Sequence, residues 1–238
     1  MRGPVGGAIG LVRRLSHAAL LARARRDFTR DSACSLHGLD LRVAPGVLHP
    51  GYFRSSRLLA DAIRDRPLAG LRVLDVGTGS GILALVAAKA GAQAVGLDMS
   101  EKAVACATGN AARNGLSQAA RFLRSDVFGA LPADATFDLV VTNPPFYPRA
   151  AEGNRDHAFA AGEGHAFIQR LAAELPSRLA AGGALVMVHS SDVDFAPVAR
   201  EFQQAGFEYR TLSSRRGFFE TLTVREFAKT ALIPGQRT

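Results

Sequence analysis

The sequence predicts an α/β fold in which helices cover both faces of a doubly wound, mostly parallel sheet. From Leu71 onward, short apolar runs alternate with segments of helical periodicity, as in "LRVLDV" followed by "ILALVAAKA". The runs are almost continuously apolar, which is typical of parallel strands that are buried on both faces. A chain of 238 residues is long enough for one such domain and a small appendage.

The first part of the chain is expected to form a small, mainly helical region ahead of the sheet. Arg66-Pro67 separates it from the strand–helix alternation, because proline does not continue a helix. We therefore divide the chain into an N-terminal helical arm with a substrate-side segment, 1–66, and a sheet domain, 67–238. The elements expected in the first part are a helical stretch over 8–26, a short strand and a Pro-Gly turn within 39–53, and a helix over 55–65 capped by Ser55.

Seven strands are predicted in the sheet domain. Five of these strands are expected at 71–76, 92–99, 120–128, 136–143 and 184–190. The helices that alternate with them are expected at 82–90, 100–114, 164–179 and 195–204. We expect the helix that begins at Gly164 to stop at Gly182-Gly183, since glycine favours a helix C-terminus. The last two strands, 207–214 and 218–227, flank a turn and are expected to pair as a terminal antiparallel hairpin.

The net charge of +8 is concentrated at the N-terminus. Residues 1–30 hold seven arginines and one acid, Asp27, so they contribute +6, and the other 208 residues contribute +2. Such an arm fits contact with RNA, and a solvated helix explains the same composition equally well. An organelle transit peptide is a weaker interpretation, because Ser16 and Thr29 are the hydroxyl residues of the arm.

The rest of the composition points to a cytoplasmic protein. No apolar run is long enough to span a bilayer, so no membrane contact is expected. Cys34 and Cys106 lie far apart and in no ligand spacing. We therefore expect neither a disulfide nor a metal site, and a reducing compartment fits best.

Candidate site residues follow the predicted strands, because ligands of doubly wound sheets bind beyond the carboxyl ends of the strands. The first strand is followed by "DVGTGSG", in which Gly77, Gly79 and Gly81 permit a tight turn and the close approach of a ligand. The next helix offers free N–H groups at its N-terminus. A dinucleotide fingerprint has its third glycine at the position of Ile82, so the spacing weakens the prediction of a dinucleotide site without excluding it.

Two aspartates end the next two strands. Asp98, in "GLDMS", lies about twenty residues past the first glycine, where a carboxylate accepts hydrogen bonds from a ribose diol. Asp126, in "SDVF", is suited to accept from the exocyclic amine of adenine. Each also has an ordinary explanation, which is a charge at a helix N-terminus for Asp98 and a turn residue for Asp126.

The fourth strand ends in "NPPF", a motif of different chemistry. Asn143 offers a side-chain carbonyl, and Pro144 offers a main-chain carbonyl held by rigid neighbours. Together they suit both hydrogens of a planar –NH₂ group, and Phe146 is placed to stack on the plane that carries it. A proline-rich loop after a strand is the ordinary explanation, and it leaves the positions of the asparagine and the ring unexplained.

These four motifs, at successive strands, resemble those of the class I S-adenosylmethionine-dependent methyltransferases over about residues 70–227. "VLDVGTGSG" is similar to their glycine-rich motif, "GLDMS" to their ribose motif, "SDVF" to their adenine motif, and "NPPF" to the catalytic motif of those that methylate nitrogen. The small-methyltransferase group, which includes release-factor glutamine, N6-adenine and N2-guanine methyltransferases, is the most similar. "HPGYFRSS" stands where the glutamine enzymes carry an Arg-Pro-Glu-Thr-Glu-like run, and it lacks the acids.

The resemblance implies a Rossmann-like fold and S-adenosylmethionine as the cofactor. The residues that it implies for cofactor binding are Asp75, Gly77, Thr78, Gly79, Gly81, Asp98, Met99, Asp126, Val127 and Asn143. The residues that it implies for catalysis are Asn143, Pro144, Pro145 and Phe146. The expected reaction is transfer of a methyl group to an amide or amino nitrogen, for which two carbonyl acceptors would hold the nitrogen and stabilise the developing positive charge.

The acceptor stays open between a protein glutamine, an adenine or guanine in RNA, and a small metabolite. A nearly neutral body favours a protein or a small molecule, whereas the basic arm favours RNA. A dinucleotide-dependent oxidoreductase is a second class, which uses the same glycine loop and leaves "NPPF" unexplained. A binding module without catalysis is a third, and the presence of Asn143, Asp98 and the three glycines argues against it.

Overall fold

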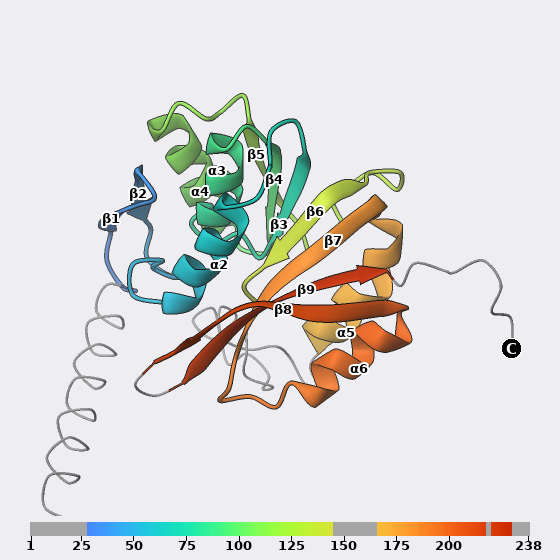
Figure 1. Ribbon diagram of the computed structural model, residues 1–238. Coiled ribbons are helices and arrows are strands. Elements are labelled where there is room, and N and C mark those ends of the chain that lie inside the picture. The colour runs from blue at the N-terminus through green and yellow to red at the C-terminus, as the bar shows by residue number, and fades with distance from the viewer. Residues whose placement is uncertain (1–27, 145–165, 218–219, 230–238) are drawn as a thin grey trace, which may run out of the picture.

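The computed structural model describes residues 28–144, 166–217 and 220–229, and these form a two-stranded hairpin and a seven-stranded sheet with helices on both faces (Figure 1). The elements of the first half are β1 (Ser32–Leu36), β2 (Leu39–Val43), α2 (Arg54–Arg64), β3 (Arg72–Val76), α3 (Ile82–Lys89), β4 (Gln93–Asp98), α4 (Glu101–Arg113) and β5 (Ala120–Arg124). The elements of the second half are β6 (Phe137–Thr142), α5 (Ala166–Glu174), a 3-10 helix (Leu175–Ser177), β7 (Leu179–Ser190), α6 (Ala196–Gln204), β8 (Phe207–Arg216) and β9 (Thr221–Lys229).

The sheet has the strand order β5-β4-β3-β6-β7-β9-β8. The first five strands are parallel, whereas β9 pairs antiparallel with both β7 and β8. The predicted fold class is therefore confirmed: a doubly wound, Rossmann-like sheet of seven strands that ends in an antiparallel hairpin. The chain order reverses between β3 and β6, which is the place where ligands bind in such sheets.

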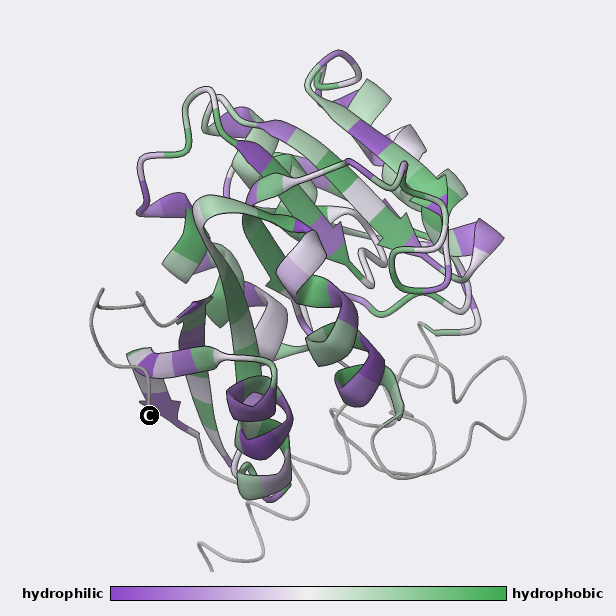
Figure 2. Cartoon of the chain, turned by 90° about the vertical axis from the view of Figure 1, so that its right-hand side faces the viewer, coloured by the Kyte–Doolittle hydropathy of each residue, from purple (hydrophilic) through white to green (hydrophobic). Residues whose placement is uncertain are grey.

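Two buried clusters lie on the two faces of the sheet. One joins residues of α2, α3 and α4 to one face, and the other joins residues of α5 and α6 to the opposite face. Figure 2 shows that hydrophobic residues follow the strands, whereas hydrophilic residues gather on the outer sides of the helices. The central strands are therefore covered on both sides, as their continuous apolar runs predicted.

The N-terminal region differs from the prediction of a mainly helical segment. Its described part, from Phe28, contains the antiparallel pair β1–β2 as well as α2. The helical stretch expected over 8–26 lies outside the described residues. The predicted serine cap is wrong, because α2 begins at Arg54 after Phe53, and Ser55 lies buried inside its first turn. The proposed boundary at 66/67 stays a prediction, and α2 packs directly on the sheet.

The helix expected over 164–179 is shorter than predicted. α5 ends at Glu174, and Pro176 lies in a 3-10 turn, because proline has no amide to continue an α-helix. β7 already begins at Leu179 and runs through Gly182-Gly183. A Cβ on Gly183 would lie 2.9 Å from the Phe137 carbonyl oxygen, so glycine permits the close approach of β6 and β7 there.

Candidate active site

Four strand ends meet where the chain order of the sheet reverses. The register pairs Val76 of β3 with Leu97 of β4 on one side and with Thr142 of β6 on the other. Thr142 Oγ1 also donates a hydrogen bond of 2.8 Å to the Val76 carbonyl. On the outer side of β4, Asp98 pairs with Arg124 of β5. The motifs that follow these strands therefore lie side by side at the carboxyl edge of the sheet.

The glycine-rich loop is held by its neighbours along β4. The amides of Gly77 and Thr78 donate to the Leu97 carbonyl at 2.9 and 2.8 Å, and the Gly79 amide donates to Asp98 Oδ2 at 2.9 Å. Both glycines have positive φ, and a Cβ on Gly77 would meet no described atom within 4 Å. The loop thus leaves room for a ligand against its backbone, while these amides, which would hold a phosphate, are already engaged.

Gly81 is required for a different reason. It precedes α3 with a φ of +85°, and a Cβ there would lie 2.9 Å from the Ala107 Cβ of α4. The predicted third glycine therefore brings two helices close together at the start of α3, where a side chain would not fit.

Asp75 is fully buried beneath the glycine-rich loop. Its Oδ2 accepts hydrogen bonds from Thr78 Oγ1 at 2.6 Å and from the Ala84 amide at 3.3 Å, whereas its Oδ1 has no partner among the described residues. Burial raises the pKa of Asp75 to about 7, because the charged form loses its hydration. The carboxyl group stands at the start of α3, where a bound anion would otherwise benefit from the helix dipole.

Asp98 orients the same loop from β4. Its Oδ2 accepts from the Gly79 amide, and its Oδ1 accepts from the Ser100 amide at 2.9 Å. Burial raises the pKa of this carboxyl, and the two amide hydrogen bonds oppose that shift. Met99, which follows it, has 56% of its surface exposed, which is high for a large apolar side chain at the edge of a sheet.

Asp126 lies on the exposed loop after β5, and Arg170 of α5 binds it. The Arg170 guanidinium pairs with the Asp126 carboxylate through Nη1, and Nη2 donates to the Asp126 carbonyl at 3.2 Å. Its Nε donates to Glu174 at 2.8 Å. The next residue, Val127, is buried and has a φ of +48°, which a β-branched residue rarely adopts. Arg170 therefore anchors a strained loop to α5.

Asn143 is fixed by two serines at the start of α2. Its Nδ2 donates hydrogen bonds to Ser55 Oγ at 3.2 Å and to Ser56 Oγ at 3.0 Å. Its Oδ1 is buried and has no hydrogen-bond partner among the described residues. A buried acceptor without a partner costs about 1–3 kcal/mol. The side chain thus presents a carbonyl oxygen whose orientation is set by α2 and whose hydrogen bond is left unmade.

The rest of the fourth motif is described in part. Pro144 follows Asn143 and is buried. Pro145 and Phe146, the other two predicted catalytic residues, lie outside the described residues. All ten positions predicted to bind a cofactor are described; Asp75 and Asp98 lie within β3 and β4, and the other eight lie on the loops that follow β3, β4, β5 and β6.

The segment before α2 closes one side of the glycine-rich loop. Val47 Cγ1 lies 4.0 Å from the position that a Cβ on Gly79 would take. Further along the segment, the rings of His49 and Tyr52 stack with centroids 4.2 Å apart. The Gly46 amide donates to the Phe28 carbonyl at 2.8 Å, so the described chain begins beside this segment.

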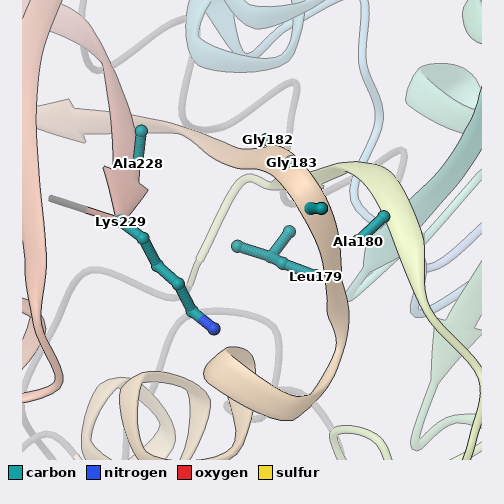
Figure 3. Close-up of a pocket in the computed structure, with 7 residues that line it drawn as sticks. Leu179, Ala180, Gly182, Gly183, Ala228 and Lys229 are labelled. Carbon is teal, nitrogen blue, oxygen red and sulfur yellow. The ribbon is translucent and has the colours of Figure 1, made fainter. Parts of the chain in front are cut away.

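Two further observations concern ligands. A hollow of about 350 Å³ lies at the start of β7, away from the four loops. Figure 3 shows Leu179, Gly182, Gly183 and Lys229, which line it. This hollow does not coincide with the motifs, and apart from Lys229 the residues that line it are apolar or glycine. Within the described ranges, no three His, Cys, Asp or Glu side chains gather as metal ligands, and no helix is long and apolar enough to cross a membrane.

A family model of known proteins matches the region that holds this geometry. The model of the methyltransferase small domain matches residues 40–219, which include all four loops. The chain belongs to the methyltransferase small domain family. The predicted resemblance to small methyltransferases is therefore confirmed.

Relatives of this family member include an RNA methyltransferase and a protein methyltransferase. The chain is 36% identical to a ribosomal RNA small subunit methyltransferase C from Chromohalobacter salexigens, over 76% of this chain and 50% of that protein. It is 40% identical to a release factor glutamine methyltransferase from Bordetella pertussis, over 62% of this chain and 57% of that protein. The chain thus spans about half the length of these curated relatives.

A solved structure shares both the fold and detectable sequence identity. A 16S rRNA methyltransferase of T. thermophilus, solved in complex with AdoMet and guanosine, superposes with a TM-score of 0.63 at 27% identity. The match covers 84% of this chain and 50% of that chain.

Sequence reasoning missed the side chains that support the motifs. Ser55 and Ser56 were expected to start or continue a helix. Nothing in their spacing links them to Asn143, which lies 87 residues after Ser56 in the chain. The contact of Arg170 with Asp126 also had no sequence signal. The resemblance of the segment around "HPGYFRSS" to the glutamine enzymes was the one sequence signal that placed it on the substrate side.

Proposed function

We propose that the chain is an S-adenosylmethionine-dependent N-methyltransferase that acts on a planar amide or amino nitrogen, in a protein glutamine or an RNA base. The observation that carries this proposal is Asn143, whose amide nitrogen is held by two serines while its buried carbonyl oxygen has no partner. That oxygen suits a donor on a substrate, because a buried acceptor gains a full hydrogen bond when a donor arrives.

The electrostatics of the loops support a cationic cofactor. The acidic groups of Asp75 and Asp98 stand beneath the glycine-rich loop, and a bound cation would favour the ionised form of Asp75, whose pKa is about 7. The amides of Gly77, Thr78 and Gly79 are already bonded to β4 or Asp98. A pyrophosphate would meet these carboxylates with few free donors, whereas a sulfonium and an ammonium group would be attracted to them. The open space beside Gly77 fits a ligand that approaches the backbone.

The roles of the residues follow from this arrangement. When bound, S-adenosylmethionine supplies a methyl group on a sulfonium. A nitrogen lone pair bonds to the methyl carbon, and the sulfur leaves with the electron pair of the C–S bond. Asn143 Oδ1 and the Pro144 carbonyl would accept the two N–H groups of the acceptor, which directs its lone pair toward the methyl group. The same oxygens stabilise the positive charge that develops on nitrogen. Solvent takes the proton after transfer.

The loops that hold the cofactor are assigned by position. Asp98 would hold the ribose, Met99 would contact the adenine ring, and Asp126 with Val127 would contact the adenine edge. Asp75 and Thr78 act from below the loop, because both are buried and bonded to each other. Phe146 is assigned to stack on the acceptor plane, as the motif suggests.

The relatives support both acceptors in this proposal, an RNA base and a protein glutamine. We also propose that the arginine-rich residues 1–30 contact RNA, since the described chain starts at Phe28 beside the segment that borders Gly79. The cytoplasmic location is part of the same proposal, because Cys34 and Cys106 are both free thiols.

The proposal is tested by two measurements on the full chain. The first compares thermal stabilisation by S-adenosylhomocysteine and by NAD, and we expect a rise in melting temperature with the former alone. A rise with NAD alone would establish the oxidoreductase alternative. The second follows a labelled methyl group into ribosomal RNA, release factors and a metabolite extract in parallel, and transfer into the metabolites alone would replace both macromolecular acceptors.

A further inference from the structure

The face of the molecule around Asn143 is rimmed by arginines that pair with no carboxylate among the described residues. Four exposed arginines lie there, and we call them the arginine rim: Arg54, Arg57, Arg215 and Arg216. Two come from the first turns of α2, beside the serines that hold Asn143, and two come from the end of β8. None of the four pairs with a carboxylate among the described residues, whereas Arg66 and Arg210 both pair with Glu226.

Register and packing place the end of β8 at the carboxyl edge of the sheet. Ser190, the last residue of β7, pairs with Leu222 of β9, and Leu222 in turn pairs with Arg215 of β8. Leu222 belongs to the buried cluster under α2, and cross-strand partners share a face of the sheet. The Arg215 side chain therefore points to the α2 side and that of Arg216 to the opposite side of the hairpin. The β8–β9 hairpin extends past the parallel strands at this edge (Figure 1).

A direct contact joins the two parts of the arginine rim. The Arg54 guanidinium lies so close to Gly217 that a Cβ at that position would be 2.5 Å from Nη1. The nearest acid of the turn, Glu220, is engaged by the Ser190 hydroxyl. The rim is thus continuous from α2 to the hairpin, and its positive charge is not cancelled within the described chain.

We propose that the arginine rim binds the phosphate backbone of an RNA acceptor and that the methylated nitrogen is therefore on an RNA base. This inference rests on the proposed N-methyltransferase function and chooses between its two acceptors. Exposed guanidinium groups bind phosphates bidentately, and several of them beside a site hold the strand on both sides of the target base. A glutamine side chain is neutral and requires no such charge.

The test compares two triple variants of the full chain with the same net charge. Arg57→Gln/Arg215→Gln/Arg216→Gln changes the arginine rim and leaves Arg54, which packs on the Gly217 turn. Arg72→Gln/Arg113→Gln/Arg121→Gln is the matched control, because these arginines lie at the start of β3, the end of α4 and on the edge strand β5. Binding of a fluorescein-labelled single-stranded RNA is measured by anisotropy over a range of KCl concentrations.

Each phosphate contact contributes about 0.7 to the slope of log K against log salt for single strands, so loss of three contacts lowers the slope by about 2. We expect this decrease in the rim variant and little change in the control variant. Equal slopes in the two variants would overturn the proposal, because charge alone would then explain RNA binding.

A second readout separates this inference from the proposed function. Methyl transfer is measured into protein-free ribosomal RNA and into a release factor, together with S-adenosylhomocysteine affinity. We expect the rim variant to bind S-adenosylhomocysteine normally and to lose at least ten-fold in transfer to RNA. Transfer into the release factor that is equal in both variants, with none into RNA, would contradict the RNA assignment and leave the methyltransferase proposal standing. If the unmodified chain does not bind S-adenosylhomocysteine, the methyltransferase proposal is contradicted. The slopes of log K against log salt still decide whether the arginine rim contacts RNA.

Discussion

Asn143 donates from Nδ2 to Ser56 Oγ across 3.0 Å, which joins the end of β6 to the first turn of α2. With the second bond to Ser55, the amide nitrogen contacts two hydroxyl groups of α2, which together hold the side chain against the start of that helix. The free carbonyl oxygen is thereby kept in one orientation. The N-terminal segment thus sets the geometry of a motif that lies far along the chain, since Asn143 follows Ser56 by 87 residues.

Removal of the serine hydroxyls tests whether they position Asn143. In the double variant Ser55→Ala/Ser56→Ala we expect the methyl-transfer rate to fall about ten-fold, which corresponds to roughly 1.4 kcal/mol of lost orientation. The affinity for S-adenosylhomocysteine should stay within two-fold. Ser56→Thr keeps a hydroxyl and should retain most of the rate. A fall in cofactor affinity equal to the fall in rate would show that α2 supports the whole site rather than the asparagine.

Replacement of Gly77 by alanine tests whether a ligand lies against the loop. The positive φ of Gly77 strains any other residue by roughly 1–2 kcal/mol, although its Cβ would meet no described atom. We expect Gly77→Ala to abolish S-adenosylhomocysteine binding in calorimetry while the chain stays folded. Gly70→Ala is the matched control, since Gly70 has a φ of +78° and equal space at the other end of β3. Similar affinities of the Gly77→Ala and Gly70→Ala variants for S-adenosylhomocysteine would contradict the proposal that a ligand lies against this loop.

The buried Asp75 should make stability depend on pH. Its pKa is raised to about 7 in the folded chain from its ordinary value of 3.8, so between these pH values the folded state holds a proton that the unfolded state has released. The stability of the folded state with respect to Asp75 is therefore fully present below about pH 4, and it is lost as the pH rises through about 7. We expect the free energy of unfolding in urea to decrease over this range by about 4 kcal/mol. Asp75→Asn should flatten the profile, whereas Asp134→Asn on an exposed loop should leave it unchanged.

The pairing of Arg170 with Asp126 predicts an effect on cofactor binding alone. Arg170→Gln removes the guanidinium that holds both the carboxylate and the carbonyl of Asp126, and with it the strained conformation of Val127. Exposed ion pairs contribute about 0.2–1 kcal/mol, so we expect a two- to five-fold weaker affinity for S-adenosylhomocysteine and an unchanged maximal rate. Glu174→Gln breaks the other contact of Arg170 and serves as the control. An unchanged affinity in Arg170→Gln would leave the pair without a role at the site.

The sequence was sufficient for the parallel strands and for the order of the motifs. Continuous apolar runs such as 71–76 are a local signal, and each motif follows its own strand, so their convergence was predictable from topology. The strand β1 was missed, because "SACSL" has a weak apolar pattern and is stabilised by pairing with β2. The extent of β7 was misjudged, since Gly182-Gly183 serves the close contact with β6 rather than a helix end.

The supporting contacts could not be predicted, because they depend on how distant elements pack. Ser55 carries the same sequence signal whether it caps a helix or bonds Asn143, and the docking of α2 on the sheet decides between these roles. The same holds for Arg170, whose partner Asp126 lies 44 residues earlier in the chain.

The most direct test of the central claim is the methyl-transfer rate of Asn143→Ala, measured with S-adenosylhomocysteine affinity on the same preparation. We expect the affinity to be nearly unchanged and the rate constant to fall about 10²–10³-fold, as when one hydrogen-bonding group at a developing charge is removed. A variant that binds S-adenosylhomocysteine and transfers the methyl group at the wild-type rate would contradict the role of the Asn143 carbonyl oxygen.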